Sequence, residues 1–522
     1  MKFTDIKLAK LADTALGEIH KGLTHNFYDV KPVLLSEQEE VFAKTLEKVI
    51  QRKAPFSQLS SDALPENFED KFREEITLAV ELNGLLEKMP SRKVFVQLLE
   101  SLIKLVAPIS FIENKALFAE KVLHSSIGLK QLAFFSLEDD FEELMVNGLE
   151  SVFVFHREYG VCKTNIVLDE KVFNNILQRI AFSIGTNFDY KNPLLDARLP
   201  DGSRVNATMK NVSPKGISLT IRKFSQVPMT MLDLIEKQTI TSEAAAFLWM
   251  MTDGFAINAK NILVVGSTAS GKTTMLNVLS NFIRLNERIV TIEDTLEVSL
   301  LDRENWIALE AKHTRGEEVM MDALLKNSLR MRPDRIVVGE VRGEEAVTLF
   351  TAMDNGHNGC LGTIHANSAR DAMTKLREKP LAVPEAMLPL VDLVVVMQRK
   401  YSKDTGVSRK VSQIAEVTSM ERKVLLANVF ELNSNRLVKT DLPSQLLEDF
   451  AEQSSMTKNE VKKEIETRQI VLEWLLKKQI RKPQEVLEFI QSYYYDSEKV
   501  LSLIYGNDVE QTPTEQNDYQ QV

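Results

Sequence analysis

One glycine-rich stretch, residues 261 to 275, constrains the fold more than any other part of this chain. The apolar run from Ile262 to Val265 predicts a buried strand. The next eight residues fit the pattern G-x-x-x-x-G-K-[ST], and they are Gly266, Ser267, Thr268, Ala269, Ser270, Gly271, Lys272 and Thr273. An amphipathic run that opens at Thr274 predicts a helix. A strand, such a loop and a helix in this order are typical of a phosphate-binding loop.

The chemistry of this loop follows from its residue types. Two glycines let successive backbone N–H groups face one point, and the helix that begins there adds partial positive charge. Lys272 can reach the β- and γ-phosphates, and Thr273 can offer its hydroxyl to Mg²⁺. We therefore predict that residues 266 to 274 bind ATP with Mg²⁺. The alternative is a Gly/Ser turn with a chance lysine.

Size and composition limit the remaining possibilities. At 522 residues, several domains are expected. A net charge of −10, with 64 basic against 74 acidic residues, argues against a nucleic-acid binder. Two distant cysteines, Cys162 and Cys360, exclude a disulfide framework and a four-cysteine zinc site, which fits a reducing cytosol. No secretory segment and no apolar run of ~20 residues is present, so any membrane role is expected through partners.

The pattern of the chain predicts five parts. Residues 1–110 read as a helical module, with periodic runs at 37–52, 68–86 and 93–106; docking and a plain helical cap are both open roles for it. The other predicted parts are a small α/β domain at 111–228, a nucleotide-binding α/β core at 229–420, a helical module at 421–505 and a disordered tail at 506–522.

The small domain carries three arginines on or beside short strands. Strands are predicted at 142–148 and 151–157, a helix at 172–184 and a tight turn at 200–202. The arginines are Arg198, Arg204 and Arg222, and ordinary surface charge is the alternative for any one of them.

Acidic residues follow two predicted strands of the core. The strand from Arg288 to Ile292 delivers Glu293, Asp294 and then Glu297. Carboxylates at the carboxyl end of a strand point into the ligand crevice of an open α/β sheet, where Mg²⁺ binds. We therefore predict metal contacts from Thr273, Glu293 and Asp294; a capping acid at a turn is the alternative.

The strand from Ile336 to Val338 ends in Gly339-Glu340. A carboxylate at position 340 can align a water against the γ-phosphate. Glycine stands where many ATPases have an aspartate, so the metal-binding acid is expected from the Glu293 cluster.

Two histidines lie close together after this strand, in Gly356-His357-Asn358-Gly359 and Thr363-Ile364-His365. Single histidines are usually structural, but two in adjoining loops near a phosphate site favour a functional role, here sensing the γ-phosphate. No cysteine pair or His-Glu-x-x-His pattern accompanies them, which argues against zinc.

Taken in order, these segments resemble the four nucleotide motifs of the secretion-superfamily hexameric ATPases: Walker A, an aspartate box, an atypical Walker B and a histidine box. Residues 198–204, 218–224, 329–335 and 339–343 resemble the branch with the tight-adherence pilus ATPases and the archaeal type IV pilus and archaellum ATPases. The resemblance covers residues 115–420, and the tetracysteine metal site of other branches is absent.

The resemblance implies a RecA-like P-loop NTPase core preceded by a small α/β (PAS-like) domain, flanked by helical N- and C-terminal modules. It implies a homohexamer with ATP between the two domains, and arginine candidates Arg198, Arg204 and Arg222 to reach the phosphates. It also implies a polytopic membrane platform partner and a location at the cytoplasmic face of the membrane.

The expected function is therefore an ATP-hydrolysing motor for a type IV pilus-like filament, an archaellum or type II/IV secretion. Lys272 and Thr273 would bind phosphates and Mg²⁺, Glu340 would orient water, Glu293 and Glu297 would support the metal or the water, and His357 and His365 would sense the γ-phosphate. A nucleic-acid-stimulated RecA-like hexameric ATPase is the first alternative, and no nucleic acid is expected. A nucleotide-gated scaffold without turnover is the second.

Overall fold

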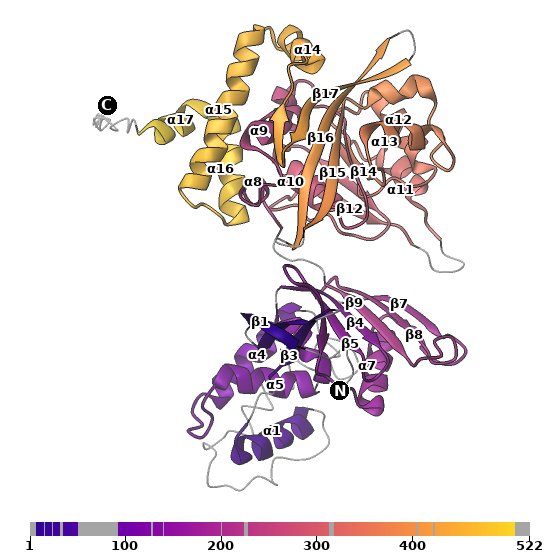
Figure 1. Cartoon of the computed structure of the whole chain (residues 1–522), viewed down its shortest axis with the longest axis vertical. Helices are drawn as coiled ribbons and strands as arrows, with labels where there is room; N and C mark the ends of the chain where they lie inside the picture. Colours follow the sequence, from indigo (N-terminus) through magenta and orange to yellow (C-terminus); the bar gives the residue numbers. More distant parts are fainter. Residues whose placement is uncertain are drawn as a thin grey trace, which may run out of the picture. The chain divides into compact units, whose positions relative to one another are not determined.

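The computed structural model describes residues 7–14, 16–22, 25–31, 35–50, 92–126, 129–138, 140–199, 201–223, 228–312, 318–402, 406–420 and 423–506. The chain forms two compact units, residues 1–225 and 226–522. Figure 1 shows the helices and strands of both. The predicted boundary near residue 228 lies close to this division.

The first unit is built on a mixed sheet with the strand order β1-β2-β3-β6-β5-β4-β9-β8-β7. Neighbouring strands are antiparallel except β3 and β6, which are parallel. The strands are β1 (Lys7–Asp13), β2 (Gly17–Gly22), β3 (Asn26–Val30), β4 (Phe141–Asn147), β5 (Val152–His156), β6 (Gly160–Thr164), β7 (Leu194–Arg198), β8 (Arg204–Thr208) and β9 (Ser218–Arg222).

Helices of the first unit fall into two groups. α7 (Glu170–Ser183) packs its apolar face on the sheet, with Phe173, Ile176 and Ile180 buried against strands β4 to β9. A separate core joins α1 (Glu37–Ile50), α4 (Arg92–Val106) and α5 (Lys115–Ser126). The short η5 (Lys130–Leu132) and α6 (Ala133–Leu137) lead into β4.

The prediction of a helical module over residues 1–110 is wrong for residues 7–30, which form three strands. These strands extend the small-domain sheet through the pairing of β3 with β6. Tyr28 is buried, and its hydroxyl donates to Glu138 Oε1 at 3.0 Å. Because such pairing depends on distant partners, short-range sequence patterns do not reveal it. The predicted helix at 68–86 and the tail after residue 506 lie outside the described residues.

The second unit is organised around a sheet of order β12-β11-β13-β14-β10-β15-β16-β17-β18. In this spatial order, each pair of neighbouring strands from β12 to β15 is parallel. Each pair from β15 to β18 is antiparallel. Their bounds are β10 (Ile262–Gly266), β11 (Ile289–Glu293), β12 (Trp306–Glu310), β13 (Arg335–Val338), β14 (Leu361–Ile364), β15 (Leu393–Ser402), β16 (Gly406–Met420), β17 (Lys423–Asn433) and β18 (Arg436–Lys439). This order, with β14 between β10 and β13, is that of a RecA-like core, and the predicted α/β class is confirmed.

Helices cover both faces of this sheet and explain why its central strands are continuous apolar runs. One face packs on α8 (Met231–Glu236), α9 (Ser242–Asp253) and α10 (Lys272–Ser280). The other face packs on α11 (Met321–Ser328), α12 (Glu345–Asp354), α13 (Ala369–Arg377) and η7 (Glu385–Leu390). Figure 1 shows α11 to α13 on one side of the strands and α9 and α10 on the other.

The C-terminal helices belong to the same core as α9 and α10. They are α14 (Gln445–Ser454), α15 (Lys458–Lys477), α16 (Pro483–Tyr495) and α17 (Ser497–Tyr505). The helical module predicted from residue 421 therefore begins only at α14. The preceding β17 and β18 continue the core sheet, because β17 pairs with β16 along its length.

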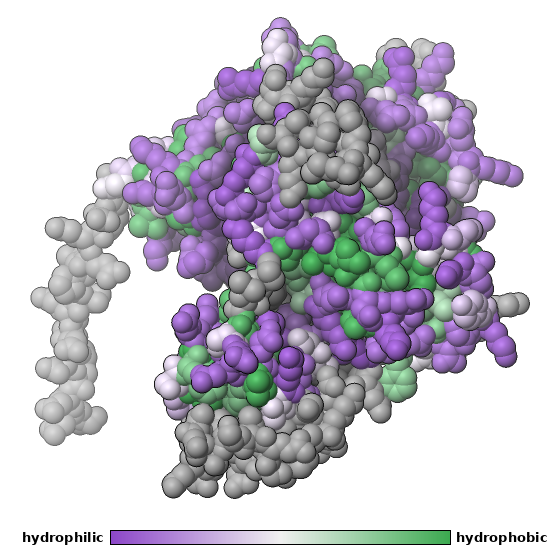
Figure 2. Space-filling view, turned by 60° about the horizontal axis from the view of Figure 1, so that its bottom comes forward, coloured by the Kyte–Doolittle hydropathy of each residue, from purple (hydrophilic) through white to green (hydrophobic). Residues whose placement is uncertain are grey.

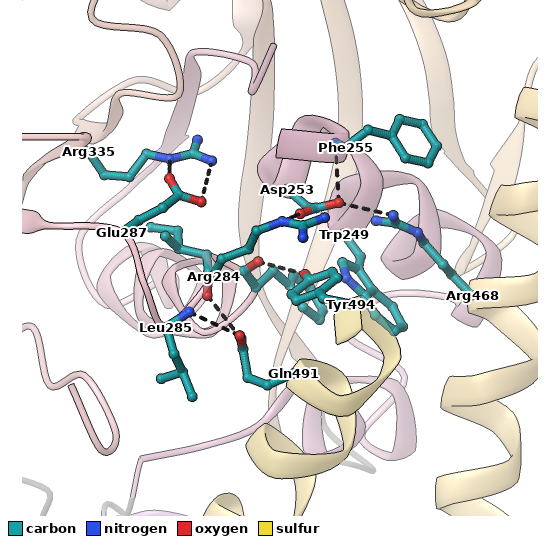
Figure 3. A network of polar contacts seen from close by, with 12 residues as sticks. Trp249, Asp253, Phe255, Arg284, Leu285, Glu287, Arg335, Arg468, Gln491 and Tyr494 are labelled. Carbon is teal, nitrogen blue, oxygen red and sulfur yellow. Dashed lines mark hydrogen bonds and ion pairs between the residues drawn. The ribbon is translucent and has the colours of Figure 1, made fainter. Parts of the chain in front are cut away.

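A buried ionic network joins α15 to the end of α9 (Figure 3). Asp253 is fully buried and accepts from Arg468 at 3.0 Å and from Arg284 at 2.7 Å. The Arg468 guanidinium also stacks over the Trp249 ring, 5.2 Å from its centroid. This pairing offsets the free-energy cost of removing the Asp253 and Arg468 charges from water.

The segment after α10 is held by α16. The Tyr494 hydroxyl donates to the Phe282 carbonyl at 2.7 Å, and Gln491 Nε2 donates to the Ile283 carbonyl at 3.0 Å (Figure 3). These bonds satisfy carbonyls just beyond a helix end, which otherwise need partners. The chain that follows the phosphate-loop helix is thus tied to the C-terminal helices.

The surface is mixed in character. In Figure 2, hydrophilic side chains (purple) cover much of the face in view, with smaller hydrophobic areas (green) among them. Among the described residues, no helix combines the length and apolar character needed to cross a membrane.

Candidate nucleotide-binding site

The glycine-rich loop connects β10 to α10 as predicted, and its glycines are required by close contacts. A Cβ at Gly266 would lie 2.4 Å from Ser270 Oγ and 2.6 Å from the Met397 carbonyl oxygen. Gly271 caps α10 with a φ of +94°, a left-handed conformation that glycine adopts without strain. Ala269 is also left-handed, with a φ of +59°.

Lys272, the first residue of α10, is buried and has two partners. Its ammonium donates to the Ser267 carbonyl at 3.2 Å and lies 3.3 Å from Nδ1 of His365. Burial lowers the pKa of Lys272, an effect that the charges of Glu340 and Glu297 oppose. The lysine charge is therefore held at the loop by acids and an imidazole from later strands.

His365 links Lys272 to Glu340. Its Nε2 lies 3.0 Å from Glu340 Oε1, on the opposite side of the ring from Lys272. Burial, and then the nearby Lys272 charge, lower the pKa of His365, so the neutral ring is favoured near pH 7. These partners assign the tautomer: Nε2–H donates to the carboxylate, and Nδ1 accepts from the ammonium.

The strand order explains why these three residues meet. β14 pairs with β10 on one side and β13 on the other, in parallel. Lys272 follows the loop after β10, Glu340 follows β13 and His365 follows β14, so all three lie at the carboxyl edge of the sheet. The imidazole lies between the other two because its strand does.

Glu293, the last residue of β11, is 2% exposed. Its Oε1 accepts from the backbone N–H groups of Glu297 at 2.8 Å and Val298 at 2.9 Å. Burial raises the pKa of Glu293 to about 7. A Cβ at residue 339 would lie 2.8 Å from Glu293 Cγ, so Gly339 makes room for this side chain. The glycine before Glu340 therefore leaves space for a carboxylate of the neighbouring strand.

The other acids of this cluster have separate partners. The Thr273 hydroxyl donates to Glu297 Oε2 at 3.1 Å. Asp294 forms an ion pair with Arg342, which follows β13. Of the three acids, Glu297 is the one in direct contact with Thr273, and the metal contact predicted for Asp294 stays a prediction.

Mg²⁺ fits the donor types around Thr273. Glu293 Oε2 is buried and has no hydrogen-bond partner within the described part of the chain. The same described residues contain no group of three or more His, Cys, Asp or Glu side chains arranged to hold a metal. Oxygen donors of this kind suit Mg²⁺ that is bound mainly through nucleotide phosphates and water.

The structure does not bring His357 to this set. His357 follows α12 and precedes β14, and its carbonyl accepts from Cys360 Sγ at 3.1 Å. Cys360 lies beside Asn261, at the amino end of β10. His357 is therefore at the opposite edge of the sheet from the phosphate loop. The expectation that both imidazoles lie beside this loop does not hold for His357.

The three candidate arginines form a row across the first unit. Arg198 pairs with Arg204 between β7 and β8, and Arg204 pairs with Arg222 between β8 and β9. Directly opposite residues share a face, so the three side chains project together from the face away from the buried Val205 and Ile221. Like charges placed this way repel, and Glu143 of β4, directly opposite Arg222, brings an acid to one end of the row.

One contact of the phosphate loop was missed from the sequence. Arg409 of β16 donates from Nε to the Ala269 carbonyl at 3.0 Å, across 140 positions of chain. No spacing rule connects residues so far apart.

Comparison with known proteins decides the family. Residues 135–476, well over half of the chain, match the family described as type II/IV secretion system protein. The chain belongs to the type II/IV secretion system protein family. This match includes β4 to β18 and all the predicted site residues.

Individual relatives of this type II/IV secretion system protein differ in coverage. An uncharacterised protein of Methanocaldococcus jannaschii is 49% identical over 247 residues, 46% of this chain and only 34% of its own length. The type IV secretion system protein PtlH of Bordetella pertussis is 35% identical over 43% of this chain and 75% of PtlH. The VirB11 ATPase structure from the Brucella suis type IV secretion system has 26% identity and a TM-score of 0.28, covering 55% of this chain and 93% of VirB11.

Proposed function

We propose that this protein is an ATP-hydrolysing hexameric motor that powers assembly of a type IV pilus-like filament or archaellum, or type II/IV secretion. The observation that carries the proposal is the Lys272–His365–Glu340 contact chain beside the phosphate loop. It supplies a cation for the phosphates, a carboxylate for the attacking water and an imidazole between them.

In the proposed reaction, Lys272 exchanges its contact with Nδ1 of His365 for the β- and γ-phosphate oxygens. This exchange frees Nδ1 while Nε2–H still holds Glu340. Glu340 then orients a water in line with the γ-phosphate. His365 reports the presence of that phosphate, because its partner on one side changes when ATP arrives.

Thr273, Glu293 and Glu297 would hold Mg²⁺ or its water ligands. The ion, when bound, neutralises charge that develops on the phosphate oxygens. Asp294 acts with Arg342, so that the loop after β11 stays connected to the loop after β13.

The arginine row of the first unit is proposed to contact nucleotide phosphates in the assembled motor. Arginine suits this role because its planar fork meets two phosphate oxygens and keeps its charge. The motor would act as a homohexamer on a polytopic membrane protein, from the cytoplasmic face of the membrane.

The test is hydrolysis and binding by two variants of the full chain. Glu340→Gln should lower kcat about 10²–10⁴-fold and still bind ATP, because it removes the water-orienting carboxylate. Lys272→Ala should lose ATP binding. Glu385→Gln, on the exposed ion pair with Arg377, is the matched control. Parent-like turnover in Glu340→Gln and Lys272→Ala would contradict the proposal, and stimulation by single-stranded DNA would favour the nucleic-acid alternative.

A further inference from the structure

The β15–β16 hairpin extends beyond the carboxyl edge of the parallel sheet, next to the phosphate loop. Met397 of β15 pairs with Gly266, the last residue of β10. β15 then continues to Ser402, and β16 returns from Gly406. The outer part of this hairpin therefore lies beside the loop that follows Gly266.

A β-bulge sets the side-chain directions on the returning strand. Val396 pairs with Gln413, but Met397 pairs with Val411, so Ser412 is the extra residue. The Ser412 hydroxyl donates to the Val396 carbonyl at 3.3 Å, which holds the bulge in place. Bulges of this type redirect the side chains beyond them.

The consequence of the bulge is visible in the packing. Met397 and Val411 both belong to the core shared with α10, whereas Val396 belongs to the core on the other face. Arg409, two residues before Val411, lies on the same face. It is thus directed toward the phosphate loop and the start of α10.

Arg409 fixes one peptide of this loop. Its Nε donates to the Ala269 carbonyl at 3.0 Å, while the N–H of the same peptide, from Ser270, donates to the Ser267 carbonyl at 3.3 Å. Ala269 has a φ of +59°, which is unfavourable for a residue with a side chain. Both ends of a strained peptide are therefore held, one of them by a residue from a distant strand.

Arg409 also limits the space beside Gly271. Its Cδ would lie 3.4 Å from a Cβ at that position. Arg399 stands directly opposite Arg409 in the hairpin, so two guanidinium groups share the face toward the loop. Two cations side by side raise the positive potential there, and a bound polyphosphate would relieve their repulsion.

We propose that Arg409 is a positioning residue for nucleotide binding: from the β15–β16 hairpin it holds the phosphate loop in the conformation that receives the phosphates. This inference rests on the proposed nucleotide-binding function. It gives the β15–β16 hairpin a role in nucleotide binding, through the bond from Arg409 to the Ala269 carbonyl.

The experiment measures ADP binding and ATP hydrolysis by the full chain with Arg409→Ala and Arg409→Lys. Arg409→Ala should weaken ADP binding and raise KM about tenfold or more, with kcat changed much less, because a charged hydrogen bond to the loop is lost. Arg409→Lys keeps the charge but moves the donor, so an intermediate loss is expected. Lys400→Ala is the control, since Lys400 is exposed on the same hairpin but pairs with Ser408 on the opposite face.

Inorganic pyrophosphate separates positioning from a direct contact with the nucleoside. If Arg409 acts by positioning the loop, Arg409→Ala should weaken the affinity for pyrophosphate, measured by competition with ADP, by the same factor as the affinity for ADP. A loss for ADP without a loss for pyrophosphate would overturn the proposal, as would parent-like binding by Arg409→Ala. If the alanine variant does not fold, parent-like ADP and pyrophosphate binding by Arg409→Lys would overturn it instead. Failure of the parent protein to bind ADP would refute the proposed function itself.

Discussion

Gly339 lies directly against the side chain of Glu293. A Cβ added at this glycine would stand 2.8 Å from Glu293 Cγ and 2.9 Å from its Oε1. The two residues end neighbouring parallel strands, and Gly339 N–H donates to the Ile292 carbonyl at 2.9 Å. The Glu293 side chain therefore occupies space that is available only because residue 339 of the next strand has no side chain.

Gly339→Ala should displace Glu293 and break its bonds to the loop at residues 297–298. We expect at least a tenfold loss of hydrolysis, with about 1–3 kcal/mol lost from the free energy of unfolding because of overpacking. Gly362→Ala on β14 is the control, since its nearest contact is a flexible side-chain end, Leu263 Cδ2 at 3.3 Å. Steady-state hydrolysis and chemical denaturation measure both quantities. Equal rates of hydrolysis by Gly339→Ala and Gly362→Ala would contradict a steric role of Gly339 in placing Glu293.

The pKa of Glu293 predicts a pH dependence of stability in the nucleotide-free protein. Burial raises this pKa to about 7 from 4.5, so the folded state binds the proton more tightly than the unfolded state. Stability from this group is full below pH ~4.5 and is lost as pH rises through about 7, by at most ~3 kcal/mol. Asp392, with a pKa raised to about 6, acts in the same direction.

Glu293→Gln should therefore flatten the decline of stability between pH 5 and 8 relative to the parent protein. Denaturation at a series of pH values measures this slope, and the contribution of Asp392 remains in both proteins. An unchanged slope would mean that Glu293 does not titrate in this range.

The buried pair of Arg468 and Asp253 predicts that the C-terminal helices are integral to the core. Arg468→Ala should cost about 3–5 kcal/mol, because Asp253 stays buried without this partner. Arg481→Ala removes an exposed ion pair with Glu236 from the same helical region and should cost at most about 1 kcal/mol. Urea denaturation compares the two, and similar costs would argue against a buried charge at Asp253.

The arginine row predicts a separation of activity from stability. Arg198→Ala, Arg204→Ala and Arg222→Ala each remove a charge from the non-core face of the sheet, so unfolding should change by less than about 1 kcal/mol. Alanine at the arginine that contacts the transferred phosphate should lower kcat about 10³–10⁵-fold. If all three variants hydrolyse ATP at the parent rate, the row has another purpose.

The parts of the site that follow buried parallel strands were accessible from the sequence. Apolar runs marked β10, β11 and β13, and the residues after them meet because carboxyl ends of parallel strands share one edge. The histidine pair shows the limit of this reasoning. His357 precedes β14 and His365 follows it, so eight positions of sequence separate opposite edges of the sheet.

Other features depend on tertiary contacts that no local pattern contains. The strands at residues 7–30 exist through pairing with β6, and the contact of Arg409 with Ala269 depends on a bulge in a distant hairpin. Gly339 was noticed, but its steric partner Glu293 became known only from the packing of β11 against β13.

The bonds from Tyr494 and Gln491 to the carbonyls after α10 bear on how this protein can be shortened. A fragment that stops at residue 441 would keep every strand of the sheet and every acid of the site. It would nevertheless remove the ring contacts that Tyr493 and Tyr494 make with Trp249, and leave Asp253 without one of its guanidinium partners. A shortened chain that keeps the core around the phosphate loop intact should therefore include α16, which ends at Tyr495.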